Sequence, residues 1–222
     1  MNPYFDPATN TPYNLLGIKD PAKLEQFEYT VTAQRIRELV AKPVAGKFDL
    51  AHAQEIHRRL FDGIYVWAGQ PRTLNMNKSA GAGWTSRFVD VDQMRALDKR
   101  MQADLAANKY LKGLTQPEFA ERITRFYADL NYMHPFPEGN GRSAQVLLGQ
   151  LAQQAGHALD YSKVSAAEWN AAAARATPQS HREAPALRRP GELQPMLDVF
   201  RAITTTQAQL GPTNTPSRGR SR

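Results

Sequence analysis

Apolar residues recur every three or four positions along most of the chain, and this spacing predicts a series of amphipathic α-helices. Signals for helix starts agree with the pattern: Asp20 precedes a proline, Asp49 precedes an apolar stripe, and Thr115–Glu118 and Ser165–Glu168 match the capping box. Asp90 is a further candidate helix cap. The predicted helices cover approximately residues 21–42, 50–64, 91–105, 116–133, 142–155, 166–177 and 193–203.

The first two predicted helices carry an apolar face and two histidines, respectively. The first helix has one apolar face, made of Leu24, Phe27, Val31 and Leu39. The second carries His52 and His57 among apolar residues. Two histidines on one helix bind a metal ion together when they are four positions apart, and these two are separated by five. We therefore expect both histidines to be structural or surface residues.

Helical spacing is lost between residues 71 and 90. Arg72–Asn77 alternates between polar and apolar residues as a strand does, Lys78–Gly83 is rich in turn-forming residues, and Trp84–Val89 fits a returning strand. The segment predicts a β-hairpin, with a surface loop as the simpler alternative. The whole pattern therefore indicates an all-α domain with one small hairpin.

Composition limits the classes of protein that fit this pattern. The 222 residues include no cysteine, which excludes a disulfide framework and a thiolate metal site. The chain has no run of about 18 apolar residues, and its N-terminus lacks the pattern of a secretory signal. The net charge is +7, and three of these charges are Arg218, Arg220 and Arg222 in a polar tail. We expect one domain over residues 1–203 and a disordered basic tail over 204–222.

The densest chemistry lies in His134–Arg142, which reads His-Pro-Phe-Pro-Glu-Gly-Asn-Gly-Arg and leads directly into a helix. Gly139 and Gly141 permit a tight backbone path at the helix start, where free N–H groups and the helix dipole attract phosphate. Asn140 is a candidate to cap the helix or to donate to an anion oxygen, and Arg142 is placed to bind a second phosphate. The stretch predicts a phosphate-binding loop, with a purely structural glycine turn as the simpler alternative.

Two side chains of this stretch add reactive chemistry. His134 is a candidate proton acceptor, because an imidazole titrates near neutral pH. Glu138 lies beside the predicted phosphate site, and a carboxylate together with phosphate oxygens is a common ligand set for Mg²⁺. These residues predict phosphoryl or nucleotidyl transfer to a hydroxyl, with His134 as the base.

The stretch His134–Arg142 resembles the core motif of the Fic (Fic/Doc) family, His-x-Phe-x-Asp/Glu-Gly-Asn-Gly-Arg-x-x-Arg. Tyr65–Gln70, which contains Trp-Ala-Gly, and the opening segment Pro3–Ile18 also resemble this family. The similarity therefore spans about residues 3–203. It implies a Fic-type bundle of helices with a small β-hairpin, called the flap, beside the active-site loop.

The resemblance also implies a reaction, the transfer of AMP from ATP to a Ser, Thr or Tyr hydroxyl of a target protein. In this reaction His134 is the base, Glu138 holds Mg²⁺, and Arg142 binds the leaving phosphates. The backbone N–H groups that stabilise the developing charge belong to Gly139, Asn140 and Gly141. Phe136 is expected to pack inward and to hold the loop in place.

The resemblance assigns residues 71–90 to the flap and residues 134–145 to the core motif. The flap of this family holds the target segment by strand addition, which fixes the acceptor hydroxyl through main-chain pairing. The flap residues that are candidates for contacts with target or nucleotide are Lys78, Trp84 and Arg87. A target protein is therefore an expected partner.

One position departs from the family pattern. Gln145 stands where the family has its second arginine, which contacts the far phosphate of the nucleotide. Glutamine donates a hydrogen bond but brings no charge. The alternatives are therefore transfer of UMP, phosphate or phosphocholine, or a Fic fold that binds a partner without transfer. A basic protein associated with nucleic acid is a further alternative, which the lack of a nucleic-acid motif disfavours.

Many members of this family carry an inhibitory helix with the pattern Ser/Thr-x-x-x-Glu-Gly/Asn. In the sequence given, Glu138 is the one glutamate followed by glycine or asparagine, and it belongs to the core motif. We therefore expect a toxin that a separate small antitoxin restrains, with an unrestrained enzyme as the alternative. The expected location is the bacterial cytoplasm, with delivery into another cell as the alternative.

Overall fold

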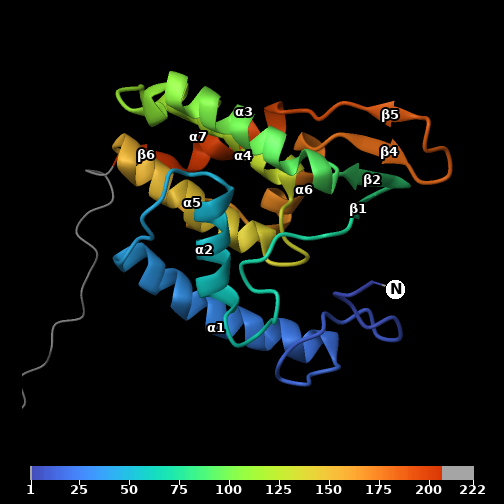
Figure 1. Ribbon diagram of the computed structural model, residues 1–222. Coiled ribbons are helices and arrows are strands. Elements are labelled where there is room, and N and C mark those ends of the chain that lie inside the picture. The colour runs from blue at the N-terminus through green and yellow to red at the C-terminus, as the bar shows by residue number, and fades with distance from the viewer. Residues whose placement is uncertain (1, 207–222) are drawn as a thin grey trace, which may run out of the picture.

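The computed structural model describes residues 2–206, which form a helical domain with two small antiparallel sheets (Figure 1). This architecture confirms the expected all-α bundle with a small flap. None of the described helices is long and apolar enough to cross a membrane. The α-helices are α1 (Pro21–Ala41), α2 (Leu50–Phe61), α3 (Met94–Ala107), α4 (Gln116–Met133), α5 (Asn140–Ala155), α6 (Ala166–Ala176) and α7 (Gln194–Ile203).

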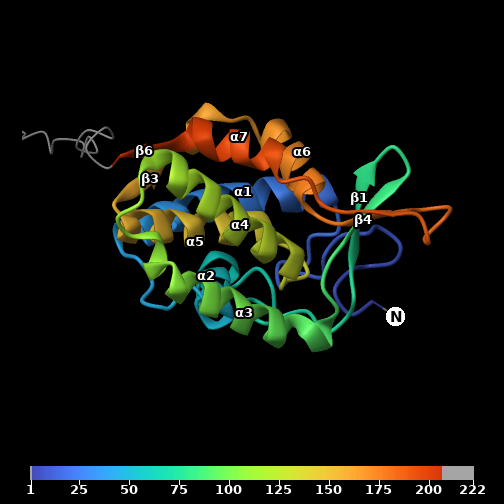
Figure 2. The same cartoon turned by 90° about the horizontal axis from the view of Figure 1, so that it is seen from above.

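Helices α4 and α5 form the centre of the bundle. Helix α5 packs against α1, α2 and α4, whereas α4 packs against α3, α5 and α7. Figure 2 shows the two central helices between α2 and α3 on one side and α6 and α7 on the other. Their inward side chains Ile123, Leu148 and Leu151 are fully buried. The loop at residues 134–139, which joins α4 to α5, is therefore held between the two central helices.

The helix starts follow the signals in the sequence, with one exception. The carboxylates of Asp20 and Asp49 accept hydrogen bonds from backbone N–H groups in the first turns of α1 and α2. Both predicted capping boxes are present, at the starts of α4 and α6. The prediction for Asp90 is wrong, because its side chain makes no capping bond and a 3₁₀ turn (Val91–Gln93) follows it. Helix α3 begins only at Met94.

The inward face of α1 is more polar than the sequence pattern predicts. Leu24 and Leu39 are buried as expected, but Phe27 is 37% exposed. The middle of the inward face is occupied by Glu28 and Thr32, which are 5% and 1% exposed. The prediction that Phe27 belongs to the buried face is wrong, because it assumes that apolar residues alone occupy that face. The neighbouring carboxylate is buried instead, since it has partners on other elements.

The flap is part of a larger sheet than the sequence predicts. This sheet has the strand order β1-β2-β4-β5 and is antiparallel throughout. Its strands are β1 (Asn77–Gly81), β2 (Trp84–Arg87), β4 (Gln179–His181) and β5 (Arg188–Arg189). The predicted hairpin is present, but the first strand begins at Asn77. The prediction of a strand over 72–77 followed by a turn from Lys78 is therefore wrong.

Strands β4 and β5 lie between the last two predicted helices, in a segment where the spacing of apolar residues predicts no strand. They are short and polar, and they form because β2 offers a second edge: Trp84 lies opposite His181 in the register of β2 and β4. As a result β2 is paired on both sides, whereas β1 remains an edge strand of the sheet.

A second sheet joins the segment that follows α5 to the segment that follows α7. It pairs β3 (His157–Leu159) with β6 (Thr204–Thr206) in antiparallel register. The predicted boundary between domain and tail, placed before Thr204, is therefore three residues too early, because β3 gives residues 204–206 a strand partner. The rest of the predicted tail, residues 207–222, lies outside the described residues.

Candidate active site

The predicted phosphate-binding loop connects the two central helices through two left-handed residues. His134 ends α4 with φ of 42°, and Gly139 precedes α5 with φ of 81°. The Asn140 amide closes the loop, because its Nδ2 donates to the Phe136 carbonyl (2.7 Å) and its Oδ1 accepts from the Phe136 N–H (2.9 Å). The prediction that the Asn140 side chain caps the helix is therefore wrong. Its Nδ2 uses one of its two N–H groups in the loop, so donation to an anion stays a prediction.

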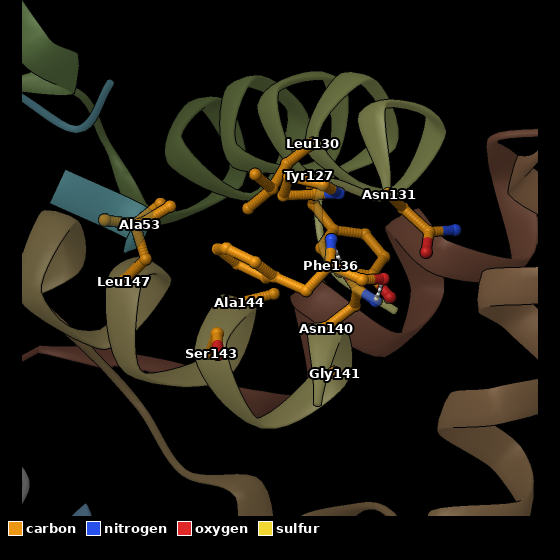
Figure 3. A pocket seen from close by; sticks show the side chains of 11 residues that line it. Ala53, Tyr127, Leu130, Asn131, Phe136, Asn140, Gly141, Ser143, Ala144 and Leu147 are labelled. Atoms are coloured by element: carbon orange, nitrogen blue, oxygen red, sulfur yellow. Dashed lines mark hydrogen bonds between the residues drawn. The ribbon is translucent and has the colours of Figure 1, made fainter. Parts of the chain in front are cut away.

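Phe136 holds the loop in the core, as expected. It is 1% exposed, and its ring stacks on that of His57 with 3.9 Å between the ring centroids. Figure 3 shows the Phe136 ring between Leu130 of α4 and Ala144 of α5. The cavity that these residues line has a volume of about 20 Å³, close to that of a single water molecule. It belongs to the packing of the loop and is too small for a substrate.

His57 supports the loop from α2. Its Nδ1 accepts the Gly69 N–H (2.8 Å), and its Nε2 lies 3.0 Å from the Glu138 carbonyl oxygen. Burial lowers the pKa of His57 to about 4, so its ring is neutral and Nε2–H donates to that carbonyl. A Cβ at Gly139 would clash with the Phe61 ring and approach His57, so the loop fits closely against α2. His57 is structural, as predicted, but what it supports is the site.

His134 is held as a neutral base. Its ring stacks on Phe88, with 3.7 Å between the ring centroids and 8° between the ring planes. Burial lowers the pKa of His134 to about 3, and the positive charges of Lys78 and Arg72 contribute in the same direction. At pH 7 the imidazole is therefore uncharged and has a lone pair that can accept a proton.

Arg72 ties the base of the flap to the catalytic loop. Its buried guanidinium donates to the carbonyl oxygens of His134 (2.9 Å) and Leu74 (2.7 Å). It also donates to the Val89 carbonyl (2.5 Å), and the Arg72 backbone N–H donates to the Pro135 carbonyl (2.7 Å). The Arg72 side chain thus joins the segments at both ends of the flap to the backbone of His134.

A pocket of about 130 Å³ lies between the loop, strand β1 and the N-terminal segment. It brings together His134, Glu138 and Lys78, which are three of the predicted site residues. An added Cβ at Gly141 would meet no atom within 4 Å, so the space in front of the helix start is open. The N-terminal segment contributes Phe5 to the wall, which sequence reasoning missed. A ligand here contacts the base, the carboxylate and the start of α5 together.

The start of α5 has the features of an anion site. The N–H groups of Asn140, Gly141 and Arg142 lie in its first turn, where no intrahelical acceptor exists. The Gly139 N–H donates to the Glu138 carboxylate (2.9 Å), so a negative group already lies at the positive end of the helix. The described residues contain no group of three or more His, Cys, Asp or Glu that could hold a metal ion. A cation at Glu138 therefore needs further oxygens from the ligand.

Arg142 lies at the loop as predicted, but its side chain faces α1 and α2. Its Nη2 pairs with the Glu28 carboxylate at 2.5 Å and lies 3.8 Å from that of Glu138. The guanidinium carbon is 4.7 Å from the centre of the Phe61 ring. The side chain is 23% exposed, so part of the guanidinium is accessible to a phosphate.

Besides Phe136, Gly139 and Arg142, three further predicted residues do not line the His134 pocket. Gln145, one turn further along α5, lines a groove between α1 and α5. Trp84 packs under Arg189, whose guanidinium carbon lies 4.1 Å from the centre of its ring. Arg87 lines a separate pocket together with Arg189. Lys78 is the predicted flap residue that the structure brings to the catalytic loop.

The residues that sequence reasoning missed share a recognisable signal. Glu28, His57 and Arg72 are titratable residues that are nearly or fully buried. A charged or polar group on the inward face of a predicted helix must have a buried partner, so Glu28 could have been noticed in this way. His52 is buried as well, with its Nε2 3.0 Å from Oε1 of Gln150, and the prediction of a structural role for it agrees with this contact.

Known proteins share this arrangement. Residues 47–152, which include α2, the flap and the loop, match the model of the Fic/DOC family. The "Probable protein adenylyltransferase Fic" of Salmonella typhimurium is 32% identical over 171 residues, which cover 77% of this chain and 82% of that protein. The chain belongs to the Fic/DOC family. The fold, the loop and the flap described above are therefore those of a Fic domain.

Two further proteins from Bartonella are similar to this chain. "Protein adenylyltransferase VbhT" of Bartonella schoenbuchensis is 39% identical over 167 residues, which cover 75% of this chain but 34% of that protein. The chain thus spans about a third of that relative's length. The crystal structure of BepC from Bartonella tribocorum, a VirB-translocated effector with bound AMPPNP, superimposes with a TM-score of 0.79 and 29% identity. The superposition covers 92% of this chain and 97% of the chain in that crystal structure.

Proposed function

We propose that the protein is an adenylyltransferase that moves AMP from ATP to a Ser, Thr or Tyr hydroxyl of a target protein. The observation that carries this proposal is the pocket that joins a neutral His134 to the first turn of α5. A base and an anion site on one loop suit transfer of a phosphate-linked group to a hydroxyl. Relatives named protein adenylyltransferase, and BepC with its bound AMPPNP, support ATP as the donor.

The chain's own groups account for the transfer. The neutral His134 imidazole accepts the proton of the target hydroxyl, and the oxygen attacks the α-phosphorus of ATP. The bond from that phosphorus to the bridging oxygen breaks, pyrophosphate leaves with the electron pair, and AMP remains on the target oxygen. The N–H groups of Asn140 and Gly141 donate to the α-phosphate oxygens as their charge rises, which lowers the barrier.

Glu138 and Arg142 bind the rest of the triphosphate. The Glu138 side chain is 41% exposed at the edge of the pocket, so its carboxylate fits a Mg²⁺ ligand whose other oxygens come from the nucleotide. The chemistry that Mg²⁺ supplies there is the neutralisation of phosphate charge. Arg142 donates to the leaving phosphates with those N–H groups that its pairing with Glu28 leaves free.

The target segment lies along β1, the edge strand of the flap sheet beside the pocket. Main-chain pairing with an edge strand fixes the position of the hydroxyl and demands little of the target sequence. Lys78 on β1 contributes a positive charge next to both the target and the nucleotide.

A separate small antitoxin protein restrains the enzyme in the bacterial cytoplasm. The support for this part of the proposal is the sequence, in which no glutamate outside the core motif fits the inhibitory pattern. Expression of the chain alone should slow bacterial growth, and co-expression with a small neighbouring gene should restore it. Equal growth inhibition by the wild type and by His134→Ala contradicts a toxic transfer activity.

The test of transfer uses nucleotides labelled on the α-phosphate and a bacterial lysate. Wild-type protein with labelled ATP should label a protein band, and His134→Ala should lower the rate by about 10²–10⁴-fold, as loss of a general base does. His181→Ala is the control, because His181 is a half-buried histidine on β4 that does not line the His134 pocket. A band of equal intensity with His134→Ala would remove the proposed base from the mechanism.

The position of Gln145 favours a second candidate function, in which a nucleotide other than ATP supplies the transferred group. This residue replaces the family's second arginine and lies in the groove between α1 and α5 instead of the His134 pocket. The same assay with labelled UTP, GTP and CTP decides between donors. Labelling from UTP and not from ATP supports UMP transfer, whereas labelling from ATP alone supports AMP transfer.

A further inference from the structure

Glu28 is a buried charge for which the reaction above has no use. It lies on the inward face of α1 and is 5% exposed, and both of its oxygens have partners. The Tyr65 hydroxyl donates to Oε1, and Arg142 Nη2 donates to Oε2 at 2.5 Å. Burial and the adjacent Glu28 carboxylate raise the pKa of Tyr65, so its hydroxyl remains a donor. With a partner on each oxygen, the carboxylate is fixed in one orientation.

The guanidinium of Arg142 is held from three sides. The Glu28 carboxylate accepts a hydrogen bond from Nη2, and Thr32 Oγ1 lies 3.5 Å from Nη1. The guanidinium carbon lies over the Phe61 ring, 4.7 Å from the ring centre. These contacts come from α1 and α2, whereas Arg142 itself belongs to the first turn of α5. Three helices therefore converge on the group that the reaction uses to bind phosphate.

The Glu28–Arg142 pair stays together when a phosphate binds. If Arg142 swung away toward a ligand, Glu28 would remain as a buried carboxylate without its positively charged partner, which is strongly unfavourable. Arg142 must therefore bind phosphate from the position in which Glu28 holds it. That position lies beside Glu138, whose carboxylate is 3.8 Å from the same Nη2.

We propose that Glu28 is a positioning residue, which orients Arg142 for the phosphates beyond the α-phosphate of the nucleotide. This inference rests on the proposed nucleotide binding at the loop. Glu28 itself contacts neither the nucleotide nor the target. Its effect is confined to nucleotides that have a β-phosphate, because the α-phosphate is bound by the N–H groups at the start of α5.

The test measures binding of AMP, ADP and ATP, each with Mg²⁺, by titration calorimetry. Glu28→Gln keeps the shape of the side chain and removes its charge. We expect it to weaken ADP and ATP binding by about 10- to 100-fold, as loss of an orienting contact does, and to change AMP binding by less than about twofold. Glu25→Gln is the matched control, because it makes the same change on the exposed face of the same helix.

A double-variant cycle separates positioning from general destabilisation. In the Arg142→Ala background, Glu28→Gln should produce no further loss of ADP affinity, because the group that it orients is gone. Tyr65→Phe removes the donor to the other carboxylate oxygen and should weaken ADP binding in the same direction, but less. If a thermal melt shows that Glu28→Gln does not fold, Tyr65→Phe with the same cycle carries the test.

Each contrary result has its own meaning. ADP affinity that is unchanged or tighter in Glu28→Gln overturns the inference, because Glu28 then has no orienting effect or competes with the phosphate. An equal loss for AMP and ADP, or a further loss in the Arg142→Ala background, overturns it in favour of a purely structural role. Wild-type protein that binds none of the three nucleotides overturns the proposed function, and this inference with it.

Discussion

At the scale of single residues, two glycines of the catalytic loop are needed for different reasons. Gly139 has φ of 81°, and a Cβ at this position would clash with the Phe61 ring. Gly141 has no such backbone requirement, and a Cβ there would point into open space. Gly139 is therefore required by the fold of the loop, whereas Gly141 keeps the space in front of the helix start free for an anion.

Alanine at these two positions should separate stability from binding. Gly139→Ala should lower the free energy of unfolding by about 1–3 kcal/mol and abolish transfer, because it combines backbone strain with overpacking. Gly141→Ala should leave stability equal or raised by up to about 1 kcal/mol, since alanine favours helix, while nucleotide binding weakens. Urea unfolding and titration calorimetry measure the two effects. Unchanged nucleotide affinity in Gly141→Ala would contradict an anion site at this turn.

His57 should make the stability of the protein depend on pH. Its folded-state pKa is lowered from 6.5 to about 4 by burial, so below pH 6.5 the unfolded chain binds a proton that the folded chain does not. Stability should therefore fall as the pH is lowered from about 6.5 to 4, by up to about 3 kcal/mol for this group. Urea unfolding at several pH values between 7.5 and 4.5 measures this loss, because the range includes most of the interval between the unfolded and the folded pKa.

His57→Gln isolates this contribution, because glutamine also donates and accepts a hydrogen bond but does not titrate. The stability difference between wild type and variant should be largest at pH 7.5 and should shrink toward pH 4.5. Histidine NMR signals of the folded protein, compared with those of the chain unfolded in urea, report the protonation of His57 directly. A stability difference that is constant over this range contradicts the assignment of a buried neutral imidazole.

At the scale of elements, the flap is a strand of a sheet and not a free hairpin. Strand β2 is paired with β1 on one side and with β4 on the other, and Arg72 joins the base of the flap to the catalytic loop. Strand β1 has one edge without a strand partner among the described residues, and its residues Asn77 and Lys78 line the pocket. The flap therefore combines a fixed position relative to His134 with a free row of main-chain groups for a target.

Hydrogen exchange should show this asymmetry. The amide protons of β2 should exchange more slowly than those of β1, because both sides of β2 face a paired strand while one side of β1 faces solvent. Peptide-resolved deuterium uptake of the folded protein measures the difference, and the short sheet of β3 and β6 serves as an internal comparison. Equal uptake in β1 and β2 would mean that β4 does not brace the flap in solution.

At the scale of the whole molecule, the sequence predicts what depends on neighbours along the chain. Capping residues and apolar spacing placed the helices, and the motif from His134 placed the loop, because both signals are local. The contacts that complete the site are not local: Arg142 lies 114 positions from Glu28, and His57 lies 81 positions from Glu138. Strand β4 likewise has no apolar alternation of its own, and it becomes a strand because β2 lies beside it.

The position of the loop between the two central helices has a consequence for how such a protein can change over evolutionary time. The reacting groups are fixed by the core, so substitutions in them are costly in stability as well as in activity. The outer strands of the flap sheet, β1 and β5, are short, polar and mostly exposed. New targets can therefore be acquired by changes in β1 and β5, while the residues of the catalytic loop and the reaction that they perform stay the same.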